Sequence, residues 1–189
     1  MKKYLIIAGC LLLNSCMFGT SKPSDFYSLQ AETAITSLSK AKYSIGVNEV
    51  GVFGNLSNPQ IILKEKDSTQ QSISETNRWA ESLDTMIQYT LVNNLMGYLP
   101  NAYIKPRTYS SETFKYSISL DVNQMTGVLG EQAVLAVWWK INNAGGETMT
   151  QKYSHFSAPV ENTYDSYVRT QSELLNKLAK EIATFIAKL

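Results

Sequence analysis

The chain has 189 residues, of which 44% are hydrophobic and 17% charged, with 17 lysines and arginines against 16 aspartates and glutamates. A hydrophobic content this high excludes an intrinsically disordered chain, and the balanced charge gives no basic face of the kind that nucleic-acid binding requires. The length suits one domain with a sizeable core.

The first residues have the pattern of a bacterial export signal. Lys2 and Lys3 precede a mostly apolar run over 4–13, and small residues follow it. As a helix those ten residues span only about 15 Å, about half of the hydrocarbon layer. We therefore expect residues 1–15 to be a signal peptide and not a membrane span. Its removal leaves 15 basic side chains against 16 acidic ones.

A lipidation site is expected directly after this signal. The sequence Leu13-Asn14-Ser15-Cys16 resembles a bacterial lipobox, whose cysteine takes a diacylglycerol and becomes the new N-terminus. Cys10 is a competing site, but it would leave about six apolar residues in the signal core, below the usual minimum of roughly seven. A disulfide between Cys10 and Cys16 fails once Cys10 leaves with the signal. We expect a covalent lipid on Cys16, a lipidated tether over 16–25 and one domain over 26–189, with no other cofactor.

The first half of this domain is expected to contain short strands and loops before a long helix. Strands are expected over 26–29, 43–47, 60–66 and 70–74, with loops over 31–40 and 51–59. Thr76 or Asn77 is a suitable N-cap for the helix, which Gly97 and Pro100 end. Its buried stripe, with apolar residues three or four apart, includes Trp79.

The second half of the domain is expected to be a set of strands closed by a helix. Strands are expected over 102–105, 114–122, 131–142 and 147–157, and the helix over 163–189. On the exposed side of that helix, Glu173, Lys177 and Glu181 have the i,i+4 spacing of ion pairs. The predicted fold class is α+β: a single domain with a mostly antiparallel sheet and two long helices packed on one face.

No catalytic constellation can be assembled from these residues. His155 is the only histidine, and a lone histidine is more often a packed or surface residue than a base or a ligand. No nucleophile, phosphate or metal motif is present, and no carboxylate pair stands out as an acid and base. We therefore predict no enzyme and no catalytic, cofactor-binding or metal-binding residues.

The noteworthy side chains are two adjacent tryptophans. Trp138 and Trp139 follow one another in an expected strand, so they must point to opposite faces of the sheet. One is expected under the helices. The other is either covered by another part of the domain or partly open as an interaction surface. The pair is the candidate interface.

Short motifs along the domain resemble those of the ABC-type transport auxiliary lipoproteins, the PqiC/YmbA-like family. Residues 26–29 (FYSL) resemble the family's opening FYxL, 58–62 (NPQII) its PQIV strand, 78–83 (RWAESL) its RWAEPL helix start, and 174–183 its closing helix. The matching residues outside the closing helix include Phe26, Tyr27, Leu29, Pro59, Gln60, Arg78 and Trp79. Two departures are Asn58, where arginine is common, and 53–56 (FGNL), which replaces a proline-tyrosine loop.

The resemblance implies a non-catalytic docking subunit of an ABC-linked lipid transport system that maintains envelope integrity. Such lipoproteins are thought to lie on the periplasmic face of the outer membrane, as rings of several copies that meet a tunnel-forming MCE-domain protein. Met17 is not aspartate, the usual inner-membrane retention residue in enteric bacteria, so the outer membrane is favoured.

Two other non-enzymatic functions remain open from the sequence. One is an accessory lipoprotein for outer-membrane assembly or secretion, which the identity of the co-purifying protein would reveal. The other is a binding protein for a lipid or glycan, which predicts a deep apolar pocket between the sheet and the helices.

Overall fold

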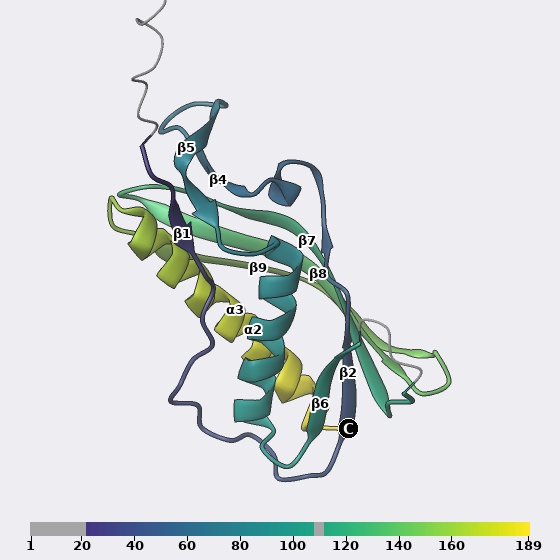
Figure 1. The fold of residues 1–189 in the computed structure, drawn as a ribbon. Helices are drawn as coiled ribbons and strands as arrows, with labels where there is room; N and C mark the ends of the chain where they lie inside the picture. The colour runs from purple at the N-terminus through teal and green to yellow at the C-terminus, as the bar shows by residue number, and fades with distance from the viewer. Residues whose placement is uncertain (1–21, 108–111) are drawn as a thin grey trace, which may run out of the picture.

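The computed structural model describes residues 22–107 and 112–189 (Figure 1). The elements are β1 (Asp25–Tyr27), β2 (Ser44–Asn48), β3 (Gly51–Val52), η1 (Gly54–Ser57), β4 (Gln60–Lys64), β5 (Gln71–Trp79), α2 (Leu83–Tyr98), β6 (Tyr103–Arg107), β7 (Tyr116–Val128), β8 (Gln132–Asn143), β9 (Thr148–Pro159) and α3 (Tyr164–Ile186). This is the α+β fold that the sequence predicts. The expected signal peptide and Cys16 lie outside the described residues.

The larger of the two sheets has the strand order β6-β2-β7-β8-β9, with β3 pairing beside β7. Its longest ladders, between β7 and β8 and between β8 and β9, are antiparallel. β2 runs parallel to both β6 and β7. Gly130 and Gly146, in the turns after β7 and β8, have positive φ values of 78° and 83°, which glycine adopts without a Cβ clash.

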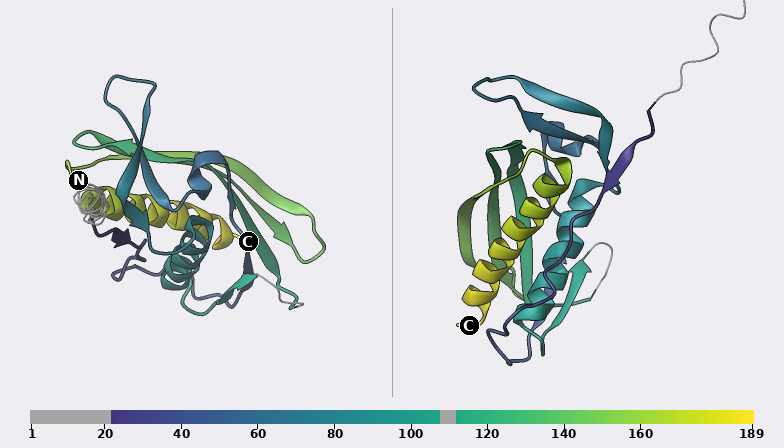
Figure 2. Two further views of the ribbon diagram at one scale, coloured as in Figure 1. Left: turned by 45° about the horizontal axis from the view of Figure 1, so that its top comes forward. Right: turned by 90° about the vertical axis from the view of Figure 1, so that its left-hand side faces the viewer.

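Both helices pack on the same face of this sheet (Figure 2, left). Leu91 and Leu95 of α2 and Leu178 of α3 are fully buried in one cluster with Ile118 of β7 and Leu135 of β8. Each such side chain contributes about 1.5–3 kcal/mol by leaving water. α3 is amphipathic because only one side of it meets this cluster, whereas α2 also buries the polar side chains of Gln88, Thr90 and Asn94.

A smaller three-stranded sheet, in the order β1-β5-β4, lies at one end of the molecule. β1 pairs parallel with β5, and β4 pairs antiparallel with it. The β4–β5 hairpin projects at this end, whereas the C-terminus lies at the opposite end (Figure 1; Figure 2, right).

One expected helix boundary is wrong. The sequence predicts a strand over 70–74 and a helix from Thr76 or Asn77, but β5 continues to Trp79 and α2 begins at Leu83. The reason is pairing across the small sheet: the Trp79 amide donates to the Pro59 carbonyl at 2.8 Å, and the Ala80 amide to the Tyr27 carbonyl at 2.9 Å. These non-local hydrogen bonds hold the segment extended. Trp79 is buried as expected, but from the end of a strand.

Trp139 begins a chain of hydrogen bonds that joins three elements. Its indole Nε1–H donates to the Ser154 hydroxyl of β9 at 2.9 Å, and that hydroxyl donates to the Glu181 carboxylate of α3 at 2.8 Å. Trp139 is only 1% exposed. A buried indole with a hydrogen-bond partner contributes both apolar area and a satisfied donor.

We therefore predict that truncating the two tryptophans destabilises the fold to different extents. Trp139→Ala should lower the free energy of unfolding by about 3–5 kcal/mol, because it empties a large buried site. Trp138→Ala should lower it by no more than about 1.5 kcal/mol, the value of an aromatic pair at the surface. Urea denaturation followed by circular dichroism measures both, and equal losses would contradict the assignment of the two faces.

Candidate functional site

The family-like motifs, which are far apart in the sequence, meet on three neighbouring strands. In the register of the small sheet, Phe26 of β1 and Gln60 of β4 both lie opposite Arg78 of β5. In the next row, Tyr27 lies opposite Trp79, whose amide bonds the Pro59 carbonyl. Three short stretches of sequence thus form one structural unit, which is the first candidate site.

The inward-facing members of this unit are explained by packing. Trp79 and Leu29 belong to the buried core, and the Trp79 ring lies 6.5 Å from that of Tyr167 in α3. The Tyr27 hydroxyl donates to the Asn77 side-chain oxygen at 3.0 Å. These residues join the small sheet to the rest of the domain, so their role is structural.

The outward-facing members have no such explanation. Phe26 is 66% exposed, and Pro59 is also exposed. Between them, Arg78 has an Nε–H that is enclosed without a hydrogen-bond partner in the described part of the chain. A large exposed aromatic side chain beside an arginine favours contact with another molecule.

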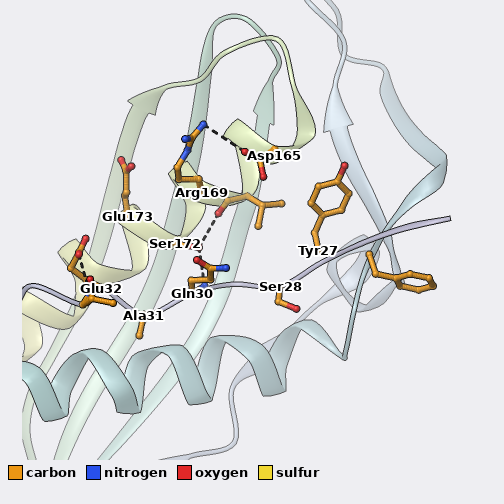
Figure 3. Close-up of a pocket in the computed structure, with 12 residues that line it drawn as sticks. Tyr27, Ser28, Gln30, Ala31, Glu32, Asp165, Arg169, Ser172 and Glu173 are labelled. Carbon is orange, nitrogen blue, oxygen red and sulfur yellow. Dashed lines mark hydrogen bonds and ion pairs between the residues drawn. The ribbon is translucent and has the colours of Figure 1, made fainter.

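A groove of about 490 Å³ runs beside this unit, between the segment after β1 and the first half of α3 (Figure 3). The main-chain amide of Gln30 donates to the Ser172 hydroxyl at 3.1 Å, and this hydrogen bond fixes the segment to the helix. Three carboxylates line the groove, from Glu32, Asp165 and Glu173, against a single arginine. This lining is polar and acidic, which does not suit a hydrocarbon chain.

The space between the sheet and the helices contains packed side chains. Leu91, Leu135 and Leu178, one from each of three elements that face this space, are fully buried in a single cluster. The deep apolar pocket that an internal lipid or glycan site requires is therefore not supported, and the groove of Figure 3 lies at the surface.

The second candidate site is the sheet face that the helices leave uncovered. Trp138 and Trp139 point to opposite faces, as their adjacency predicts. Trp138 is 44% exposed and its ring centroid lies 5.1 Å from that of Tyr153, its cross-strand neighbour in β9. Since Trp139 is buried, any contact through this pair must use Trp138, and Tyr153 is a partner that the sequence analysis did not identify. Strand register was the missing information.

The residue types that hold metal ions are not clustered in the part of the chain that the structure describes. Within 22–107 and 112–189, no three His, Cys, Asp or Glu side chains are grouped so that they could hold a metal ion. His155 is exposed on β9, opposite Ala136 of β8. In the same part of the chain, neither helix has the length and hydropathy needed to cross a membrane.

Comparison with known proteins identifies the class. The model of the ABC-type transport auxiliary lipoprotein component family matches residues 27–183, and the chain belongs to this family. Two relatives, both named intermembrane transport lipoprotein PqiC, come from Escherichia coli K12 and Shigella flexneri. Each is 24% identical over 192 residues, which cover all of this chain and all of the relative.

Two crystal structures have the same fold. One, of an uncharacterized protein, has a TM-score of 0.73 at 21% identity and covers 87% of this chain and 99% of its own. The other, from Xanthomonas campestris, has a TM-score of 0.70 at 11% identity, with 86% and 95% covered. These two structures show the fold alone, whereas membership of the auxiliary lipoprotein family rests on the match over residues 27–183.

Tyr167, whose ring lies near that of Trp79, makes the stability of the fold depend on pH in the alkaline range. Tyr167 is fully buried, its hydroxyl donates to the Met125 carbonyl at 3.3 Å, and burial raises the pKa of this hydroxyl far above its usual value. Burial also raises the pKa of Tyr27 and of Tyr98. Above a pH of about 10 the unfolded chain loses these protons and the folded chain keeps them. Unfolding therefore becomes easier as pH rises.

We predict that the free energy of unfolding falls as the pH rises above about 10, and that Tyr167→Phe removes part of this fall. The slope of one such group approaches about 1.4 kcal/mol per pH unit. At neutral pH the variant should lose only about 1 kcal/mol, for the missing hydrogen bond. Urea titrations at several pH values measure both effects. The exposed Tyr153→Phe is the matched control, and an equal change of slope in that variant would contradict the prediction.

Proposed function

We propose that this protein is an envelope lipoprotein that acts as a non-catalytic docking subunit of an MCE-type, ABC-linked lipid transport system. The match of the auxiliary lipoprotein family over 27–183 is the observation that carries the proposal. The full-length similarity to relatives named as intermembrane transport lipoproteins supports a role in transport between membranes. The exposed pair of Trp138 and Tyr153 supports a function that is exercised through contact with another protein.

The anchor in this proposal is a diacylglycerol on Cys16 in the periplasmic face of the outer membrane. Nine residues separate Cys16 from Phe26, and they can reach about 30 Å at roughly 3.3 Å each. Two or more acyl chains, at about 0.8 kcal/mol per buried CH₂, hold such an anchor permanently. Because β1 is paired with β5, the chain leaves the domain at the β4–β5 end (Figure 1). That end faces the anchoring membrane.

The partner contacts in this proposal use the two exposed aromatic sites. Phe26 lies at the anchored end, whereas Trp138 and Tyr153 lie on the uncovered face of the large sheet. Two separate surfaces suit a lipoprotein that contacts copies of itself in a ring and also the end of an MCE-domain tunnel protein. Exposed tryptophan and tyrosine are the side chains most enriched in binding hot spots.

Metabolic labelling with a radioactive fatty acid tests the anchor. The wild-type protein should incorporate label and float with outer-membrane vesicles in a density gradient, and Cys16→Ser should remove the label because no other thiol follows the signal. Cys10→Ser is the matched control and should still be labelled. Label that persists in Cys16→Ser, or flotation with the inner membrane, would contradict this part of the proposal.

Purification from crosslinked envelopes, followed by mass spectrometry, tests the docking function. The wild type should recover an MCE-domain protein, and Trp138→Ser should lower that recovery by about tenfold, the effect of losing a modest hot spot. Tyr89→Ser is the control, because Tyr89 is similarly exposed but lies on α2. Recovery of an outer-membrane barrel or secretion protein in place of an MCE-domain protein would overturn the proposal.

A further inference from the structure

A second groove, of about 380 Å³, lies along the last half of α3. It is lined by Lys177, Lys180 and Lys188 of the helix region and by Lys152 of the neighbouring strand β9. The other lining residues are Glu181, Thr184 and Phe185. We call this the α3 groove. It is distinct from the acidic groove of Figure 3, which uses the first half of the same helix.

The positive charge of the α3 groove is largely uncompensated. Glu181 is its only acid, and that carboxylate already accepts the Ser154 hydroxyl at 2.8 Å and pairs with Lys152 at 3.7 Å. The i,i+4 spacing predicted ion pairs of Lys177 with Glu173 and Glu181, but neither pair forms among the described ion pairs. The reason is that Glu181 points toward β9, and Glu173 lies in the acidic groove. Three ammonium groups are left to solvent.

The wall below these charges is apolar. Phe185 is partly buried and packs against the hydrophobic core, so its ring is held in place. The lysine side chains add their methylene stems, because a long charged side chain lays its stem along apolar surface and keeps its head in water. Residues 177, 180 and 184 are spaced along one face of α3, and residue 188 follows just after its end. The α3 groove is therefore amphipathic, with an apolar floor and a cationic rim.

The α3 groove also lies at a defined end of the molecule. The C-terminus marks the end opposite β1 and the β4–β5 hairpin (Figure 1; Figure 2, right). In a protein anchored through a residue before β1, this end faces away from the anchoring membrane. An occupant here does not belong to the anchoring leaflet and must reach the groove from the other side.

We propose that the α3 groove binds an anionic phospholipid in transit, with its phosphate between Lys177, Lys180 and Lys188 and the first part of an acyl chain against Phe185. The inference rests on the proposed function and names its cargo class. A phosphate carries the charge that the ammonium groups lack, and a volume of about 380 Å³ is within the range of small-ligand sites. An acidic protein segment would meet the lysines but would leave the apolar floor uncovered.

Calorimetric titration of the acylated mature protein in non-ionic detergent tests this inference. The probes are dihexanoyl phosphatidylglycerol, phosphatidylcholine with the same chains, inorganic phosphate and a hexaglutamate peptide. The test variant is Lys177→Gln/Lys180→Gln/Lys188→Gln. The control variant, Lys40→Gln/Lys42→Gln/Lys64→Gln, removes the same charge from exposed lysines elsewhere. Partition of lipid into the micelle is common to all three proteins, so the difference between them isolates the groove.

The inference expects saturable binding of phosphatidylglycerol that weakens about tenfold in the test variant and stays unchanged in the control. Phosphatidylcholine, phosphate and peptide should bind at least tenfold more weakly than phosphatidylglycerol. The inference is overturned if the test variant binds phosphatidylglycerol as the wild type does, if phosphate alone binds equally well, or if the peptide binds best. Thermal unfolding of both variants at the wild-type midpoint excludes misfolding.

Failure of this inference can be told apart from failure of the proposed function. If phosphatidylglycerol does not bind but the MCE-domain protein is still recovered from envelopes, the α3 groove is not a lipid site and the docking function stands. If phosphatidylglycerol binds in the groove but no MCE-domain protein is recovered, the proposed docking function is wrong, whereas the lipid site in the α3 groove is confirmed.

Discussion

The pairing of β1 with β5 is the interaction on which the arrangement of the molecule depends. Three residues of β1 form a parallel ladder with the end of β5, and the Ala80 amide closes it on the Tyr27 carbonyl. Without this ladder the segment before residue 30 would be free to leave the domain in any direction. With it, the exit of the chain is fixed at the β4–β5 end (Figure 1).

A second constraint acts at the other end of the molecule through Glu181. The chain of hydrogen bonds from Trp139 through Ser154 to Glu181 ties β8, β9 and α3 together. It also withdraws the only carboxylate of the α3 groove from the lysines on its own helix. A structural role beside the core and an unbalanced charge at the surface therefore have the same cause, since both oxygens of this carboxylate face β9, one toward Ser154 and the other toward Lys152.

Local periodicity explains how much of this could be predicted from the sequence. The alternation of Phe114 to Val122 and the stripe of α3 are strong patterns, and both elements appear where expected. The predicted start of α2 is wrong because Trp79 and Leu83 have helical spacing. The hydrogen bonds that keep this segment extended join Trp79 to Pro59, 20 positions away, and Ala80 to Tyr27, 53 positions away. The same non-local pairing assembles the motifs around Arg78, and the strand register brings Tyr153 to Trp138. No local pattern contains that information.

The two halves of α3 border grooves of opposite charge. Its first half borders a groove with Asp165 and Glu173, and its last half borders the lysines of the α3 groove. A phosphate near the β1 end would meet carboxylates and be repelled, whereas near the C-terminal end it would meet ammonium groups. The helix thus makes the distal end the favoured place for an anionic headgroup. In the anchoring proposed above, the β1 end lies nearer the membrane, so this order of charges favours an anionic lipid that arrives on the side away from the anchor.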